Sequence, residues 1–362
     1  MGAWDDSHVD YRRRQAAALE RAKRGGVDAL LLSHLPNIRY LTGFSGSNAL
    51  LLLEERGAVL FTDGRYREQA RQQAQSASIV VPRQGDLWNA AAKRAARMRR
   101  IGLELDHVTL AQRAHWPGSA KGIKSAGGWI EQLRSIKDEE EIDAIERAVR
   151  LASSVFAPTL RRLRAGMAET EAAGWLELGL RRAGGEGVAF DTILAGGARS
   201  ALVHAQPSAA PLPRRGWVVM DYGVVLDGYH SDMTRTVHMG AASRQARQVY
   251  AAVAAAQAAA IAAVRAGVPC AVVDGAARQV LRRAGYGRYF PHSTGHGLGL
   301  EIHEAPRLAA TSTERLRENQ VITIEPGVYI PDWGGVRIED VVRVRAQGCE
   351  ILTPTPKDLI VL

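Results

Sequence analysis

Apolar and polar positions along the first third of the chain predict helices and strands in alternation. Residues 6–24 repeat apolar side chains at helical spacing until Gly25 and Gly26 end the pattern, and the apolar run 27–33 predicts a buried strand. The pattern then predicts a helical turn, a Gly-rich loop and a strand within 37–53, strands at 58–62, 79–81 and 101–104, and helices at 63–75 and 86–99. Such alternation is typical of an α/β domain.

The pattern changes near residues 133–141, which predicts two domains, 1–134 and 135–362. We expect Asp138 to cap a long helix at 138–163, with Glu141 as its capping-box partner. Helices are also predicted at 170–183, 244–266 and 270–284, and strands at 189–195, 217–220, 237–239, 321–324, 336–344 and 349–352. The second domain is therefore a mixture of helices and strands.

Composition narrows the class of protein. A chain of 362 residues with 46% hydrophobic and 23% charged residues is typical of a soluble globular protein with two cores. Its two cysteines, Cys270 and Cys349, predict no disulfide framework and favour a cytoplasmic location. We find neither a signal peptide at the start nor an apolar run long enough to span a membrane, so no membrane partner is expected.

The net charge of +9 raises the question of a nucleic-acid partner. The densest basic cluster, at 93–100, contains no interleaved aromatic residues. We interpret it as a solvated helix face and predict no nucleic-acid binding.

Candidate chemistry begins with two carboxylates, Asp221 and Asp232. Asp221 follows the apolar run 217–220, and an Asp227-Gly228 turn separates the two acids. A hairpin around that turn would return both to one end of the sheet. Two close carboxylates repel unless one holds a proton or a cation lies between them. By itself the pair fits a surface turn equally well.

Three further polar residues interrupt or end apolar runs of the second domain. His296 lies in a Gly-His-Gly sequence, Glu325 ends the run 321–324, and Glu339 lies within 335–340. A buried charge at such a position is costly unless it is paired or bound to a metal. Four carboxylates and one imidazole form a hard ligand set that suits two divalent ions, with Mn favoured and Co or Zn as alternatives.

These five residues and their neighbours resemble the M24 metallopeptidase family, which includes methionine aminopeptidase, aminopeptidase P and prolidase. The likeness rests on the ordered ligands and on the sequences 231–236, 295–299 and 325–329. The sequences 39–44, 61–66 and 101–104 resemble the creatinase/prolidase N-terminal domain, which methionine aminopeptidase lacks. The resemblance therefore favours the proline-specific branch. It implies a creatinase-like α/β domain, a pseudo-twofold α+β pita-bread catalytic domain and a homodimer.

The resemblance also implies roles for individual residues. Asp221 would bind one ion, Asp232 and Glu339 both, and His296 and Glu325 the second, with Glu325 also moving a proton. His204 and His303 would be catalytic groups that hydrogen-bond the substrate and the tetrahedral intermediate. His292 would line the proline pocket, although a structural histidine fits as well. Arg337 resembles a family arginine that supports the site, and it is also a candidate substrate-binding residue. Apart from the resemblance, Thr234 and Tyr229 are candidates to hold the ligating carboxylates by hydrogen bonds. Arg307 would either bind a substrate carboxylate or face solvent.

The expected function is hydrolysis of Xaa-Pro bonds in proline-containing peptides by a metal-bridging hydroxide. Three variants remain open: a dipeptidase, an aminopeptidase P that removes the first residue of longer peptides, and an enzyme that trims from the C-terminus. A metal-free creatinase-like enzyme and a silent peptide-binding module are disfavoured, because either would be expected to lack part of the ligand set, and all five ligands are present.

Overall fold

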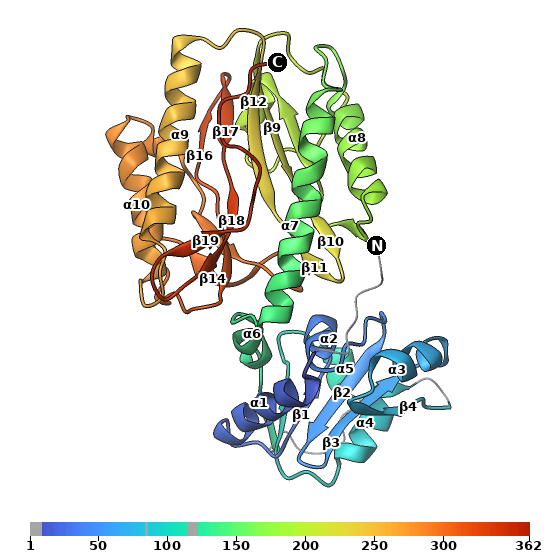
Figure 1. Ribbon diagram of the computed structural model, residues 1–362. Coiled ribbons are helices and arrows are strands. Elements are labelled where there is room, and N and C mark those ends of the chain that lie inside the picture. Colours follow the sequence, from blue (N-terminus) through green and yellow to red (C-terminus); the bar gives the residue numbers. More distant parts are fainter. Residues whose placement is uncertain (1–8, 84–85, 115–121) are drawn as a thin grey trace. The chain divides into compact units, whose positions relative to one another are not determined.

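The computed structural model describes residues 9–83, 86–114 and 122–362 (Figure 1). Internal contacts divide the chain into two compact units, Gly2–Arg134 and Ser135–Leu362.

The first unit is built on a six-stranded sheet with the order β4-β3-β2-β1-β5-β6. Its strands are β1 (Ala29–Leu32), β2 (Ala49–Glu54), β3 (Gly57–Thr62), β4 (Ala77–Val80), β5 (Ile101–Leu103) and β6 (Ile123–Ser125). Strands β1, β2 and β3 are antiparallel neighbours, whereas β4, β5 and β6 join in parallel. All residues of β1 and β2 are buried, which explains their unbroken apolar runs.

The helices of this unit are α1 (Tyr11–Arg24), α2 (Leu35–Thr42), α3 (Arg67–Gln73), α4 (Leu87–Ala95), α5 (Leu110–Ala114) and α6 (Trp129–Arg134). A short 3₁₀ turn, Gly64–Tyr66, precedes α3. The sequence pattern did not predict β6, because Ile123 is its only apolar residue. The segment expected as a helical turn near residue 37 is a complete helix, α2.

The basic cluster near α4 is only partly a solvated face. Arg94 and Arg97 both donate to the carboxylate of Glu54, at 2.9 and 3.1 Å. Glu54 is buried at the end of β2, so it draws two arginines of the cluster toward the sheet. Part of the cluster therefore neutralises a buried acid.

The first half of the second unit packs two helices on a three-stranded sheet. Helices α7 (Glu139–Leu160) and α8 (Glu169–Arg182) lie beside β8 (Ile193–Gly196), β9 (Gly216–Tyr222) and β12 (Met233–Met239) (Figure 1). The strand order is β12-β9-β8. Asp138 and Glu141 form the predicted capping box at the start of α7. A smaller sheet contains β7 (Gly187–Val188), β10 (Val224–Leu226) and β11 (Tyr229–His230).

The second half repeats this order of two helices followed by strands. Helices α9 (Arg244–Ala263) and α10 (Cys270–Arg283) pack on a five-stranded sheet with the order β14-β13-β15-β18-β19. Its strands are β13 (Gly295–Gly297), β14 (Glu304–Leu308), β15 (Val321–Ile324), β18 (Asp340–Val344) and β19 (Cys349–Ile351), and the hairpin β16 (Gly327–Ile330) and β17 (Gly334–Arg337) joins the same core. Two 3₁₀ turns lie at Gly197–Ala201 and Gly287–Tyr289.

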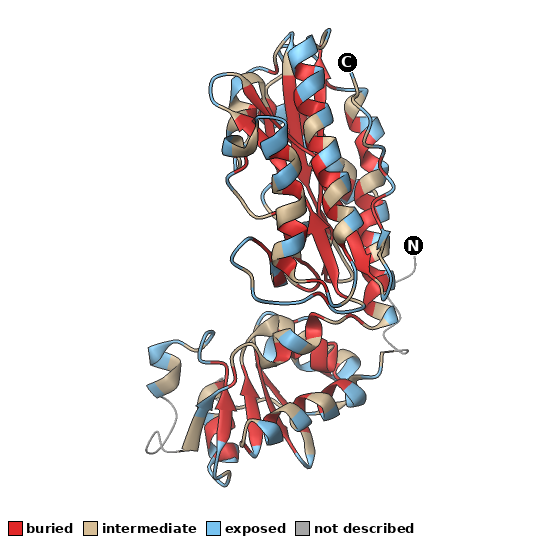
Figure 2. Ribbon diagram, turned by 90° about the vertical axis from the view of Figure 1, so that its left-hand side faces the viewer, coloured by how far each residue is buried: buried red, intermediate tan, exposed pale blue. Residues whose placement is uncertain are grey.

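Burial follows these layers in both units. Figure 2 shows buried residues along the strands and on the inner faces of the helices, while outer helix faces are exposed. In the described part of the chain, no helix combines the length and the apolar character that crossing a membrane requires.

Candidate active site

A tight hairpin brings Asp221 and Asp232 to one end of the first half's sheet. Strands β9 and β12 pair antiparallel, with Tyr222 opposite Met233 and Asp221 opposite Thr234. Beyond them, β10 pairs with β11 around the two-residue loop Asp227-Gly228. Both loop residues have positive φ, 52° and 75°, which is the requirement of the type I′ turn that Asp-Gly favours. The predicted hairpin is therefore present.

The second half contributes three side chains from neighbouring strands. His296 lies in β13, Glu325 directly follows β15, and Glu339 precedes β18. Strand β15 pairs with both β13 and β18. The approach of β13 to β15 requires glycine, because a Cβ at Gly295 would lie 1.9 Å from the carbonyl oxygen of Thr323.

The prediction of one continuous strand at 336–344 is wrong. The chain leaves the β16–β17 hairpin after Arg337 and enters the five-stranded sheet at Asp340. Between them, the backbone N–H of Glu339 donates to the carbonyl of Thr234 in β12, at 3.1 Å. This change of sheet brings Glu339 to the carboxylates of the first half.

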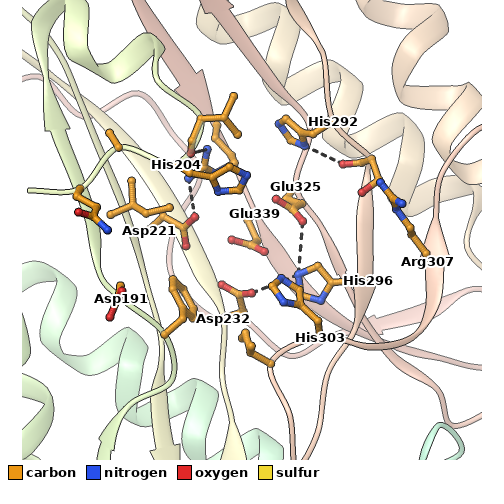
Figure 3. Close-up of a pocket in the computed structure, with 18 of the residues that line it drawn as sticks. Asp191, His204, Asp221, Asp232, His292, His296, His303, Arg307, Glu325 and Glu339 are labelled. Atoms are coloured by element: carbon orange, nitrogen blue, oxygen red, sulfur yellow. Dashed lines mark hydrogen bonds and ion pairs between the residues drawn. The ribbon is translucent and has the colours of Figure 1, made fainter. Parts of the chain in front are cut away.

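The five candidate ligands face one another across one cavity (Figure 3). His296 Nε2 lies 3.6 Å from Asp232 Oδ2 and 3.6 Å from Glu325 Oε1. Ligand atoms of Asp232, His296 and Glu339 all lie within 4.8 Å of one another. Asp221 lines the same cavity, where its Oδ2 accepts a hydrogen bond from Arg337.

Two buried carboxylate oxygens indicate that this group is built for cations. Asp221 Oδ1 and Glu339 Oε1 have no hydrogen-bond partner among the described residues. Burying such atoms without a partner is costly, and a bound cation would remove that cost. Carboxylate oxygens with one imidazole are also the donors that Mn, Co and Zn accept. The residues present therefore fit divalent metal ions.

Burial sets the protonation of the ligands. It raises the pKa of Asp232 and of Glu339 well above the ordinary range, with neighbouring carboxylates adding to the effect. It raises the pKa of Glu325 to about 8 and lowers the pKa of His296 to about 4. The imidazole is thus neutral near pH 7, as a metal ligand must be. Asp232, Glu325 and Glu339 therefore favour the protonated form in the metal-free protein, so metal binding to them is expected to release protons.

Arg337 connects the carboxylates with their surroundings. Its buried guanidinium donates to Asp221 at 2.5 Å, to the Tyr329 hydroxyl at 2.6 Å and to Thr234 at 3.1 Å. The Thr234 hydroxyl donates in turn to Glu339 Oε2 at 2.7 Å. These contacts favour a supporting role for Arg337 over direct substrate binding.

Tyr229 was expected beside these residues. Its hydroxyl instead donates to Glu141 of α7, at 3.2 Å.

The other predicted residues line the cavity, whose volume is about 660 Å³. His204 and His303 are exposed, and the rings of His303 and His296 have centroids 4.5 Å apart. Both ring nitrogens of His292 have partners: Nε2 and the Tyr329 hydroxyl lie 3.0 Å apart, and Nδ1 and the Ser293 carbonyl 2.8 Å. Arg307 is exposed in β14. A cavity of this size is large enough for a small peptide.

Sequence reasoning assigned no role to several residues of the site. Asp191 and Gln206 line the cavity, but nothing in the sequence distinguishes them from other loop residues. Tyr329 links His292 with Arg337, and a hydroxyl inside the apolar strand β16 was the available signal.

Family models match both parts of the chain. The model of metallopeptidase family M24 matches residues 143–346, and that of the creatinase/prolidase N-terminal domain matches residues 14–136. The chain belongs to metallopeptidase family M24. This M24 chain is 33% identical to the Xaa-Pro dipeptidase of Pyrococcus horikoshii over 94% of its own length and 97% of the relative's.

Solved structures resemble this M24 chain over nearly all of its length. An Xaa-Pro dipeptidase from Bacillus anthracis has a TM-score of 0.94 and 35% identity, over 98% of this chain and 100% of the other. An X-Pro aminopeptidase from Thermotoga maritima has a TM-score of 0.88 and 37% identity, over 94% of this chain and 100% of the other. These matches confirm the predicted family and fold class, and they identify the chain as a peptidase.

Proposed function

We propose that this M24 peptidase hydrolyses Xaa-Pro bonds and acts as a dipeptidase. The proposal rests on the convergence of four carboxylates and one imidazole in a single cavity. The similar proteins from Pyrococcus horikoshii and Bacillus anthracis are named Xaa-Pro dipeptidases, which supports the choice of substrate. Proline lacks an N–H and has a fixed ring, so its peptide bond requires a pocket shaped for it.

Five residues would hold two divalent ions, with Mn favoured and Co or Zn as alternatives: Asp221, Asp232, His296, Glu325 and Glu339. Ions bound there supply Lewis acidity and lower the pKa of a bound water toward neutrality. Glu325 would take up the proton that the attacking water loses, because its carboxylate faces the cavity beside His296 and is ionised when it holds a metal ion.

The remaining polar residues bind and orient the substrate. His204 and His303 are exposed to the cavity and donate hydrogen bonds to the carbonyl oxygen as negative charge develops on it. His292, held by Tyr329, contributes to the wall beside the proline ring. Arg307 presents an exposed guanidinium that can bind the carboxylate of a dipeptide in bidentate fashion.

An Xaa-Pro aminopeptidase is the second candidate, because the similar Thermotoga maritima structure carries that name. Such an enzyme must leave room beyond proline for the rest of the peptide. The two candidates therefore differ in whether a free proline carboxylate is required.

The deciding experiment is to incubate Mn-loaded protein with Ala-Pro and with longer Ala-Pro-Xaa peptides and to identify products by mass spectrometry. Cleavage of the dipeptide alone supports the dipeptidase, and we then expect Arg307→Met to raise KM for Ala-Pro. Release of alanine from longer peptides supports the aminopeptidase. Absence of cleavage by protein that binds Mn normally would refute both.

The ligand assignment has its own test. Asp232→Ala is expected to lose bound metal as well as activity, measured by metal analysis after dialysis. Full metal content in that variant would contradict the assignment.

We also propose a cytoplasmic homodimer with neither nucleic-acid nor membrane partners. Light scattering coupled to size exclusion tests the homodimer, and a single-subunit mass would refute it.

A further inference from the structure

A buried ion pair joins Lys137 to Glu304 at the edge of the cavity. Lys137 Nζ lies 3.0 Å from Glu304 Oε2, and the two side chains are only 1% and 6% exposed. Removing two charges from water is expensive, and such a pair often adds no stability over apolar side chains of similar size. Stability alone therefore does not account for a buried ion pair at this position.

Glu304 organises the loop that carries His303. It directly follows His303, and it lines the cavity at the first position of β14. Its Oε1 accepts a hydrogen bond from the backbone N–H of Glu301 at 3.2 Å. A Cβ at Gly299 would lie 2.8 Å from the same oxygen, so the loop 299–304 folds closely around this carboxylate.

The backbone at Lys137 is fixed from two sides. Its N–H donates to the carbonyl of Asn319 at 3.0 Å, and the Asn319 side chain accepts from Arg343 of β18 at 2.8 Å. Asp138, the next residue, caps α7 through the capping box. The lysine therefore extends to Glu304 from a rigid base.

We propose that Lys137 is a positioning residue, which holds His303 at the cavity by anchoring the Glu304 carboxylate. The inference rests on the proposed function, in which His303 contacts the substrate. Without the lysine, the Glu304 carboxylate loses its buried ammonium partner and gains by turning toward the water of the cavity. That movement would shift the adjoining His303 away from its position.

The test compares Lys137→Met, Glu304→Gln and the double variant with Arg150→Met. Arg150 forms an exposed ion pair with Glu146 on α7 and serves as the control. For Lys137→Met we expect kcat for Ala-Pro to fall by about ten- to a hundredfold with little change in KM, because a small misplacement of a catalytic group has effects of this size. Bound Mn should stay at the wild-type level.

The double variant separates positioning from general damage. It removes both charges of the pair, and the glutamine that replaces Glu304 would keep an oxygen for the Glu301 N–H, so its kcat should exceed that of either single variant. If Lys137→Met does not fold, Glu304→Gln and the double variant provide the same comparison.

Hydrogen exchange gives a measurement that does not depend on activity. The amides of 299–304 should exchange faster in Lys137→Met than in the wild type or in Arg150→Met. Unchanged exchange there, or an unchanged kcat beside an active wild type, would overturn the positioning role. An inactive wild type in which these amides still respond to the substitution would instead refute the proposed function and leave the anchor supported.

Discussion

Replacing Thr234 by valine would remove one hydroxyl from the carboxylate cluster while keeping the branched shape of the side chain. Thr234 is fully buried, donates to Glu339 Oε2 at 2.7 Å and accepts from Arg337 Nε at 3.1 Å. Because Glu339 Oε1 already has no partner among the described residues, valine would leave the carboxylate without any hydrogen bond from them.

The expected loss of metal affinity depends on the charge of Glu339 in the metal-free and the metal-bound protein. A hydrogen bond to a charged group contributes about 1.5–3 kcal/mol. Burial raises the pKa of Glu339, so the carboxyl can be protonated in the metal-free protein, whereas a metal ligand must be ionised. The Thr234 hydroxyl therefore stabilises the metal-bound form more. If most of that energy is lost, the affinity for Mn²⁺ should fall by about ten- to a hundredfold, since about 1.4 kcal/mol corresponds to a factor of ten.

Titration calorimetry of chelator-treated protein with Mn²⁺ would measure this change. Thr355→Val is the matched control, because the Thr355 hydroxyl is also buried but has no hydrogen-bond partner among the described residues. We expect the control to bind Mn²⁺ like the wild type. Equal affinities for Thr234→Val and the wild type would refute the reasoning, as would an equal loss in both variants.

Two further predictions concern stability. The pKa of about 8 for Glu325, against 4.5 for an ordinary glutamate, means that the folded metal-free protein keeps a proton that the unfolded chain has released, so its free energy of unfolding should fall between pH 6.5 and 8. The buried histidines, whose pKa is lowered from 6.5, act in the opposite direction, but their effect fades above pH 6.5 as the histidines of the unfolded chain lose their protons, whereas Asp232 and Glu339 act in the same direction as Glu325. Urea unfolding in EDTA that shows stability rising from pH 6.5 to 8 would be contrary evidence. Gly295→Ala should destabilise the protein by at least about 1–3 kcal/mol, because its Cβ would overlap the Thr323 carbonyl. The control is Gly275→Ala within α10, where a Cβ would meet no atom within 4 Å. It should stabilise the protein by about 0.5–1 kcal/mol, because alanine favours the helix more than glycine does. Equal unfolding midpoints for the two variants would contradict this account.

Elements with a strong local signal were predictable from the sequence. The apolar runs of β9 and β15 matched their burial, and Asp227-Gly228 gave the hairpin that unites two of the acids. Asp221 and Glu325 were recognisable because each ends an apolar run, whereas Asp232 and His296 were assigned through the resemblance to a known family. The convergence of the five candidate ligands required that resemblance as well, since no local pattern specifies which strands become neighbours.

Elements that depend on distant partners were missed. Strand β13 is Gly-His-Gly and has no apolar residue that would predict a strand. It becomes a strand because its backbone pairs with β15. The break before β18 arises because Glu339 bonds to Thr234 in the other half of the unit. Likewise, Lys137 and Glu304 are 167 residues apart, and nothing in either local sequence predicts that they form an ion pair.

The division of the ligands between two halves of one unit gives the ions a second effect. Asp221 and Asp232 come from the first half, and His296, Glu325 and Glu339 from the second. Ions held by both sets would act as a non-covalent cross-link and oppose opening of the unit, because binding to the folded state alone stabilises it. Protein made under metal starvation would then open more often and be degraded faster. Metal supply would thus set the amount of enzyme in the cell as well as its rate.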